Sequence, residues 1–125
     1  MTPDLLIVDD NLQFLAVARR LLEGEGMNVV GVASTSADAL RYANELHPDV
    51  ALVDVDLGEE SGFDLARQLT EGGKGRRVIL ISAYPAQDLE DLIEMSPAAG
   101  FLPKSQLSAR AILDLLASTD DHDAR

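Results

Sequence analysis

Short apolar runs, separated by stretches long enough for one helix, recur along this chain and constrain the fold most strongly. Four of the five runs are rich in Val, Ile and Leu and lack alternating polar residues. Such runs are typical of strands buried on both faces, as in a parallel sheet. The fifth is predicted to be a strand mainly from its position. The predicted strands are residues 5–8, 29–33, 50–53, 78–81 and 100–102.

The stretches between these runs carry apolar residues at the spacing of amphipathic helices. Leu15, Ala18 and Leu22 share one face of the first stretch. Gly24 and Gly26 are expected to end this helix, and His47-Pro48 to end the second. The apolar positions of the other four are Ala39, Leu40, Ala43 and Leu46; Leu65, Ala66 and Leu69; Leu89, Leu92 and Ile93; and Ile112, Leu115 and Leu116.

This alternation of strand and helix predicts an α/β fold with a doubly wound, five-stranded parallel sheet. Right-handed crossovers place five helices on both faces of such a sheet. A chain of 125 residues fits one domain. We expect that domain at residues 1–118, and a polar tail or the start of a linker at residues 119–125.

The composition excludes several classes of function. The chain has 22 acidic and 10 basic residues and no basic cluster longer than Arg76-Arg77, so we expect no direct binding of nucleic acid. It has no cysteine, which excludes disulfides and thiolate metal sites. No apolar run approaches the ~18 residues of a membrane span, and the first residues lack the basic start of a secretory signal. We therefore expect a cytoplasmic protein with no membrane partner.

Polar side chains follow the predicted strands at their carboxyl ends, where open α/β sheets bind ligands. Each has a simpler explanation when taken alone. Asp10 with Asn11 could cap a helix, Ser82 could belong to a turn, and Lys104 could be a surface charge. Their convergence on one edge favours a shared site instead. The residues are Asp9, Asp10, Asp54, Asp56, Ser82 and Lys104.

The chemistry of this set points to a phosphoryl group. Carboxylates packed together repel, so they must take up protons or bind a cation. Because the chain has no cysteine and His47 and His122 fall outside the set, its oxygen ligands favour Mg²⁺ over zinc. A divalent cation, an ammonium and a hydroxyl beside a nucleophilic carboxylate are suited to phosphoryl transfer.

Four stretches carry a family resemblance: LLIVDDN (5–11), ALVDVDLGEESG (51–62), VILISAY (78–84) and GFLPKS (100–105). In this order and spacing they resemble the response-regulator receiver family of two-component signalling. The resemblance implies a flavodoxin-like sheet with strand order 2-1-3-4-5. It also implies a phosphoaccepting switch, not an ordinary enzyme, that catalyses its own phosphorylation and dephosphorylation.

The same resemblance implies roles for the acidic residues. Asp54 matches the phosphoacceptor, which takes its phosphoryl group from a sensor histidine kinase. Asp10 matches a direct ligand of Mg²⁺, Asp9 a neighbour that acts largely through water, and Asp56 a position whose backbone carbonyl completes the metal shell. Mg²⁺ is therefore the implied cofactor, with Asp9, Asp10, Asp54 and Asp56 as its site.

Ser82 and Lys104 match the hydroxyl and the ammonium that contact the phosphoryl oxygens, and with Asp54 they form the implied catalytic group. Phe101 matches an aromatic switch residue that fills the space vacated by Ser82. Pro103 is expected to follow a cis peptide bond. The surface made by the fourth helix, fifth strand and fifth helix is then expected to change shape and to be recognised by an output partner.

Two features concern the loop after Asp54 and the output. Gly58 stands where the family often has proline, and Gly58 with Gly62 predicts a looser loop.

The stretch GFLPKSQLS (100–108) most resembles receivers joined to helix-turn-helix DNA-binding domains, so such a domain outside this chain is one expected partner. A free-standing receiver that controls a downstream protein stays open, as does a homodimer.

Two other functions stay open. Asp54-Val55-Asp56 resembles the Asp-x-Asp of haloacid-dehalogenase-type phosphatases, although that motif normally follows the first strand. The chain could also be an interaction module that keeps the fold without being phosphorylated. A P-loop nucleotide binder is excluded, because residues 72–75 lack its spacing and precede a strand; we predict a surface turn there.

Overall fold

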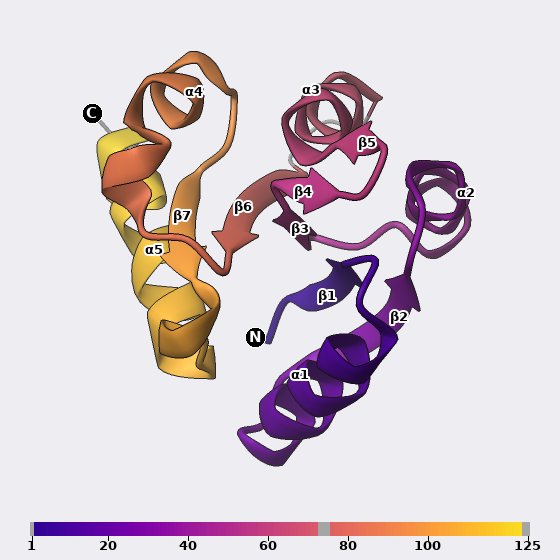
Figure 1. Cartoon of the computed structure of the whole chain (residues 1–125). Coiled ribbons are helices and arrows are strands. Elements are labelled where there is room, and N and C mark those ends of the chain that lie inside the picture. Colours follow the sequence, from indigo (N-terminus) through magenta and orange to yellow (C-terminus); the bar gives the residue numbers. More distant parts are fainter. Residues whose placement is uncertain (1, 73–75, 124–125) are drawn as a thin grey trace.

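One five-stranded parallel sheet forms the centre of the computed structural model, which describes residues 2–72 and 76–123 (Figure 1). Its strand order is β2-β1-β3-β6-β7, which confirms the predicted order 2-1-3-4-5. The predicted turn at residues 72–75 lies mostly outside the described residues. The strands are β1 (Asp4–Val8), β2 (Asn28–Ala33), β3 (Val50–Asp54), β6 (Arg77–Ser82) and β7 (Gly100–Pro103).

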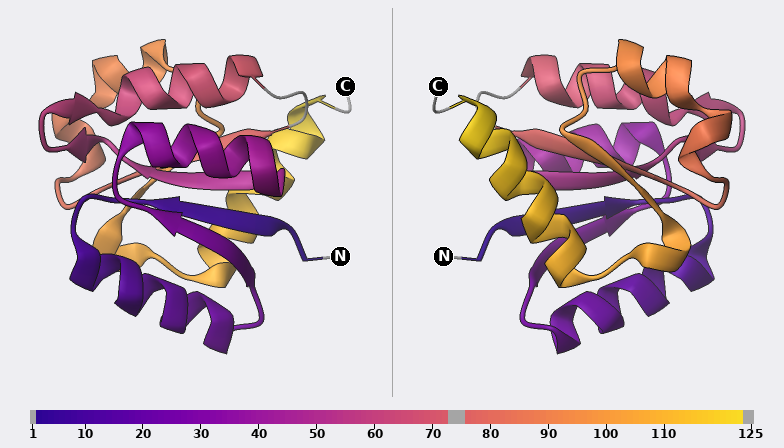
Figure 2. Two further views of the ribbon diagram at one scale, coloured as in Figure 1. Left: turned by 90° about the vertical axis from the view of Figure 1, so that its right-hand side faces the viewer. Right: turned by 90° about the vertical axis from the view of Figure 1, so that its left-hand side faces the viewer.

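Helices cover both faces of the sheet, as predicted (Figures 1 and 2). On one face lie α1 (Leu12–Gly24) and α5 (Ala109–Asp123). On the other lie α2 (Ser36–Leu46), α3 (Gly62–Gly72) and α4 (Glu90–Met95). No helix in the described parts of the chain is long and apolar enough to cross a bilayer.

Successive side chains of the central strands point to opposite faces of the sheet. Leu5 and Ile7 of β1 pack in the cluster of α1 and α5, while Leu6 and Val8 pack in the cluster of α2 and α3. All four are fully buried. Burial on both faces explains why the run is continuously apolar, since neither face of the strand meets water.

Local signals set the ends of the first two helices. The Asn11 side chain accepts a hydrogen bond from the Phe14 N–H over 3.1 Å and caps α1. This cap directs the chain into a helix immediately after Asp9 and Asp10. The second helix, α2, ends before His47-Pro48, as the sequence predicts, and His47 adopts a left-handed φ of 49° there.

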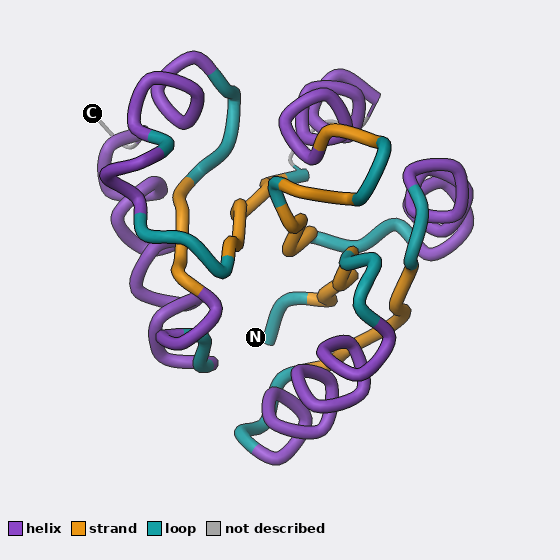
Figure 3. The backbone as a smooth tube through the Cα atoms, in the orientation of Figure 1, coloured by secondary structure: helices purple, strands orange, loops and turns teal. Residues whose placement is uncertain are grey.

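A small hairpin after β3 was not foreseen. It consists of β4 (Asp56–Leu57) and β5 (Glu60–Ser61), joined by the pair Gly58-Glu59, and it leads directly into α3 (Figure 3). Gly58 has a φ of 74°, which proline cannot adopt because its ring fixes φ near −65°. The local turn therefore explains the absence of the proline that the family often has.

Gly62 makes a close backbone contact, whereas the expected looseness of the loop stays a prediction. A Cβ atom at Gly62 would lie 1.9 Å from the carbonyl oxygen of Asp54. The Gly62 N–H donates to the Val55 carbonyl over 3.0 Å. The glycine thus lets the start of α3 pack directly against the end of β3, and it holds the loop close to the sheet.

The fourth helix is present, but the burial expected for its apolar residues is not. Leu92 is 51% exposed and Met95 is 84% exposed. Within the described chain, α4 has no buried side chain. The short 3₁₀ helix η1 (Ala86–Asp88) precedes α4 and leaves it only six residues long.

The C-terminal region differs from expectation in two details. Pro103 ends the edge strand β7 with φ −62° and ψ 142°, and every peptide bond in the described residues is trans. The expected cis bond was therefore wrong: Pro103 continues the extended strand opposite Ser82. Beyond it, η2 (Lys104–Gln106) leads to α5, which continues to Asp123. The division into residues 1–118 and a tail stays a prediction.

Substituting Gly62→Ala should lower the free energy of unfolding by about 3 kcal/mol, because the new methyl group overlaps backbone atoms that cannot rotate away. Gly24→Ala is the matched control, since a Cβ there meets nothing within 4 Å. We expect the control to be neutral or to stabilise α1 by up to about 1 kcal/mol. Urea unfolding measures both, and similar stabilities for the two variants would contradict the close contact.

Candidate functional site

Two buried carboxylates stand at the carboxyl edge of the sheet. Asp9, directly after β1, is 0% exposed and Asp54, the last residue of β3, is 5% exposed. In each, Oδ1 accepts a backbone N–H two residues further on: Asn11 over 2.9 Å for Asp9, and Asp56 over 3.1 Å for Asp54. These turns fix both side chains and leave each Oδ2 atom for another partner.

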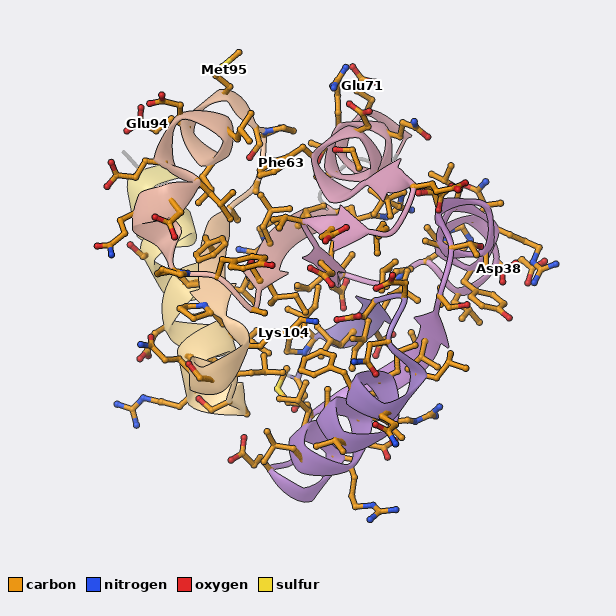
Figure 4. All side chains as sticks on the ribbon, viewed as in Figure 1. Asp38, Phe63, Glu71, Glu94, Met95 and Lys104 are labelled. Atoms are coloured by element: carbon orange, nitrogen blue, oxygen red, sulfur yellow. The ribbon has the colours of Figure 1, made fainter. Side chains whose placement is uncertain are left out.

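That partner is Lys104, which directly follows β7 and is labelled in Figure 4. Its Nζ lies 2.6 Å from Asp9 Oδ2 and 3.2 Å from Asp54 Oδ2. Burial by itself lowers the pKa of Lys104, but its contacts with Asp9 and Asp54 outweigh this and raise the pKa above 10.5. The lysine is therefore a permanent cation between two acidic groups.

The close Lys104–Asp9 contact is an ion pair without hydrogen-bond alignment. Among the described residues, Asp9 Oδ2 is buried and has no aligned hydrogen-bond donor. A buried carboxylate oxygen in this state is costly unless a cation provides further compensation. The Lys104 ammonium at 2.6 Å compensates this oxygen in part, and a bound cation would add to that compensation.

Asp9 belongs to a group of three acidic residues that could hold a metal ion. Asp9, Asp10 and Asp54 each offer one carboxylate oxygen, and these atoms lie within 4.8 Å of one another. All-oxygen donors of this kind suit a hard divalent cation. Gly58 lies beside the group, since a Cβ there would be 3.3 Å from Asp10 Oδ2.

The Asp56 side chain does not join this group. Its Oδ1 accepts the Gly58 N–H over 3.1 Å and so faces the hairpin turn. The backbone N–H of Asp56 donates a hydrogen bond to Asp54 Oδ1. The predicted role of Asp56 was that of a backbone carbonyl ligand, and it stays a prediction.

Burial also changes the acidity of Asp54. The pKa of its carboxyl is raised from 3.8 to about 6, first of all by burial. The Asp56 N–H and the Lys104 ammonium act against this rise, and the negative charge of Asp9 adds to it. Without a metal ion, the folded chain therefore holds a proton on Asp54 more tightly than the unfolded chain does.

Ser82 lies at the end of β6, the strand beside β3, and Phe101 lies on β7, the strand beside β6. Ser82 is 1% exposed and follows Ile81, the residue that pairs with Asp54. Its Oγ accepts the Tyr84 N–H over 3.0 Å. Phe101 pairs with Leu80 and packs, half-buried, on the side of α2 and α3. The structure thus brings Ser82 to the edge that carries Asp54, with Phe101 two positions back along the adjacent strand.

Sequence reasoning missed one residue of the site, Phe14. The Lys104 Nζ lies 4.3 Å from the centroid of the Phe14 ring, within the range of a cation–π interaction. Phe14 is held there because its own N–H binds the Asn11 cap in the first turn of α1. The sequence offered only an apolar residue near the start of a helix, which is more often a core position.

The comparisons with known proteins agree with this geometry. The response regulator receiver domain family matches residues 5–116. Response regulator GacA of Pseudomonas aeruginosa is 32% identical over 100 residues, which are 79% of this chain and 47% of GacA. The polar-differentiation response regulator DivK of Brucella ovis is 30% identical over 106 residues, which are 83% of this chain and 85% of DivK.

A solved structure extends the comparison to the whole fold. A response regulator protein from Burkholderia pseudomallei, with a phosphorylated aspartic acid, a calcium ion and citrate, is similar with a TM-score of 0.79 and 25% identity. The similarity covers 97% of this chain and 71% of that chain. This protein therefore belongs to the response regulator receiver domain family of two-component signal transduction. It spans about half the length of GacA.

In metal-free buffer, Asp54→Asn should raise the free energy of unfolding at pH 7.5 by about 2 kcal/mol. The folded pKa of about 6 exceeds the usual 3.8, so ionising Asp54 destabilises the fold progressively as the pH rises from about 4 to about 6. The advantage of the asparagine should therefore disappear near pH 4. Urea unfolding across this range is the measurement; an advantage that grows as the pH falls would refute the assigned pKa.

Proposed function

We propose that this receiver accepts a phosphoryl group on Asp54 and transmits a signal through the resulting change in shape. The observation that carries the proposal is the arrangement of the Asp54 carboxylate. One oxygen is fixed by the Asp56 N–H at 3.1 Å, and the other lies 3.2 Å from Lys104 in an acidic group that could hold a metal ion. Phosphoryl transfer requires a nucleophile that is fixed in position beside positive charge.

The donor we propose is a phosphohistidine of a sensor histidine kinase in the cytoplasm. An Asp54 oxygen forms a bond to phosphorus as the phosphorus–nitrogen bond breaks, and the imidazole leaves with that electron pair. The products are an acyl phosphate and a free histidine. Lys104 stays protonated throughout and offsets negative charge on the transferring oxygens.

We propose Mg²⁺ as the cofactor, with ligands from Asp9, Asp10 and Asp54 and the backbone carbonyl of Asp56. The unaligned Asp9 Oδ2 atom and the all-oxygen donor set fit such an ion. When bound, the cation offsets charge on the phosphoryl oxygens. The structure from Burkholderia pseudomallei, with its phosphorylated aspartic acid and calcium ion, supports the combination of acyl phosphate and divalent cation in this fold.

The switch we propose begins with Ser82. To contact a phosphoryl oxygen, its hydroxyl turns away from the Tyr84 N–H that it now accepts. Phe101 then fills the vacated space, and the surface of α4, β7 and α5 changes. Because the two states differ by contacts with the phosphoryl group, phosphorylation shifts their populations. Phe101 has no hydroxyl group, so packing alone separates its two positions.

The output partner is either a covalently attached domain or a separate protein. The match to GacA covers 47% of that regulator, which leaves length there for an output domain. The match to DivK covers 85% of a short regulator, which supports a free-standing receiver. We propose that the output, such as a helix-turn-helix DNA-binding domain, binds nucleic acid, and that this chain itself does not.

Incubation with acetyl phosphate and Mg²⁺, followed by intact-protein mass measurement, tests the proposal. We expect one phosphoryl adduct that requires Mg²⁺ and is absent in Asp54→Asn. Asp56→Asn is the matched control, because it keeps the backbone carbonyl and its side chain lies outside the acidic group. No adduct on the wild type would indicate an unphosphorylated interaction module, and steady release of phosphate from monoesters would indicate a phosphatase.

Phe14→Leu should slow the phosphorylation of Asp54 by acetyl phosphate about three- to tenfold, the equivalent of a cation–π interaction of ~1 kcal/mol. Leucine keeps the apolar packing of Phe14 but removes the ring that holds the Lys104 ammonium. Phe14→Tyr keeps the ring face and should restore the rate. A leucine variant as fast as the wild type, with Mg²⁺ dependence intact, would show that the ring does not position Lys104.

A further inference from the structure

The hairpin of β4 and β5 carries part of the proposed metal site. The Asp56 N–H donates to Asp54 Oδ1 over 3.1 Å, and a Cβ at Gly58 would lie 3.3 Å from Asp10 Oδ2. The hairpin pairs only Asp56 with Ser61 and Leu57 with Glu60, and a two-stranded hairpin is at best marginally stable alone. The positions of Asp56 and Gly58 therefore depend on contacts between the hairpin and the rest of the domain.

Each strand of the hairpin has a side chain anchored on the body of the domain. On β4, Leu57 is 4% exposed and packs in the cluster of α2 and α3. On β5, the Oε1 atom of Glu60 accepts the Ser36 N–H at the start of α2 over 2.9 Å (Figure 1). Because Leu57 and Glu60 pair with each other, these two contacts fix both strands at the same level of the hairpin.

The Glu60 carboxylate is well suited to this contact. Ser36 is the first residue of α2, so its N–H has no acceptor within the helix. The helix dipole favours a negative charge at this end, and a carboxylate acceptor makes the hydrogen bond charge-assisted. The Thr35 side chain already caps α2 by accepting the Asp38 N–H over 3.1 Å. Since α2 has this cap of its own, the Glu60 contact contributes more to the hairpin than to the helix.

We propose that Glu60 is a positioning residue, which holds β5 against the start of α2 and so keeps the backbone of Asp56 and the Gly58 turn in place for the divalent cation. Glu60 does not ligate the ion itself, since the acidic group that could hold a metal in the described chain does not include it. The inference rests on the proposed metal-dependent function. It adds to that function a link between α2 and the metal site.

Titration of the metal-free full chain with MgCl₂, followed by backbone amide NMR signals, measures the effect on metal affinity. Glu60→Ala should weaken Mg²⁺ binding about three- to fivefold, the scale of one exposed hydrogen bond. Glu60→Gln keeps an acceptor oxygen and should retain most of the affinity. Glu59→Ala removes the same charge from the neighbouring exposed position and should change the affinity less than twofold.

Ser36→Pro removes the donor at the other end of the contact. Proline is favourable at the first position of a helix, and Thr35 before it has φ −135° and ψ 160°, which suits a residue that precedes proline. This variant should weaken Mg²⁺ binding as much as Glu60→Ala, and the double variant no further, because both remove one interaction. Thr35→Ala removes the other cap of α2 without touching the hairpin, and it should leave the affinity unchanged.

Amide exchange with water, measured by NMR without metal, tests the positioning by itself. The N–H groups of Asp56 and Gly58 both donate to side chains in the hairpin region. They should exchange about three- to fivefold faster in Glu60→Ala and in Ser36→Pro than in the wild type, since the freed hairpin opens more often. Thr35→Ala should exchange at the wild-type rate.

The outcomes separate this inference from the proposed cofactor. A wild type that binds no Mg²⁺ would refute the cofactor and leave the exchange comparison to decide the role of Glu60. Unchanged exchange at Asp56 in Glu60→Ala would overturn the inference. So would effects of Glu59→Ala or Thr35→Ala on Mg²⁺ affinity as large as that of Glu60→Ala, or additive losses in the double variant with Ser36→Pro.

Discussion

The ammonium of Lys104 between two buried carboxylates is the interaction on which the rest of the site depends. Asp9 is fully buried and Asp54 nearly so, and carboxylates so placed repel each other and are costly to desolvate. Lys104 Nζ lies 2.6 and 3.2 Å from their oxygens and offsets much of this repulsion. The raised pKa of Asp54 shows that the compensation is incomplete, which leaves the site able to attract a further cation.

The fold supplies this arrangement through its strand order. β1 and β3 are neighbours, so Asp9, directly after β1, lies close to Asp54, the last residue of β3, while Lys104 follows β7 at the sheet edge. The contacts around them then limit movement. Asn11 caps α1 and sets Phe14 against the lysine, and Gly62 lets α3 pack on the backbone of Asp54. These contacts thus surround a pair of buried carboxylates whose charge Lys104 compensates only in part.

Much of this was predictable from the sequence, for a physical reason. Parallel strands buried on both faces read as continuous apolar runs, and their carboxyl ends must meet, so the convergence of Asp9, Asp54 and Lys104 followed from the strand pattern. Other features depend on contacts that no pattern encodes. Phe14 reads as a core residue, and Gly62 as a flexible one.

The exposure of α4 was missed for a related reason, because an apolar stripe predicts a helix but does not say what covers it.

The carboxyl ¹³C signal of Asp54, followed by NMR through a pH titration in metal-free wild type and Lys104→Gln, tests the central claim most directly. The account predicts a titration near 6 in the wild type and at a higher pH in the variant, because removal of the ammonium leaves two carboxylates without their cation. A wild-type titration near the usual 3.8, unchanged by the substitution, would contradict it.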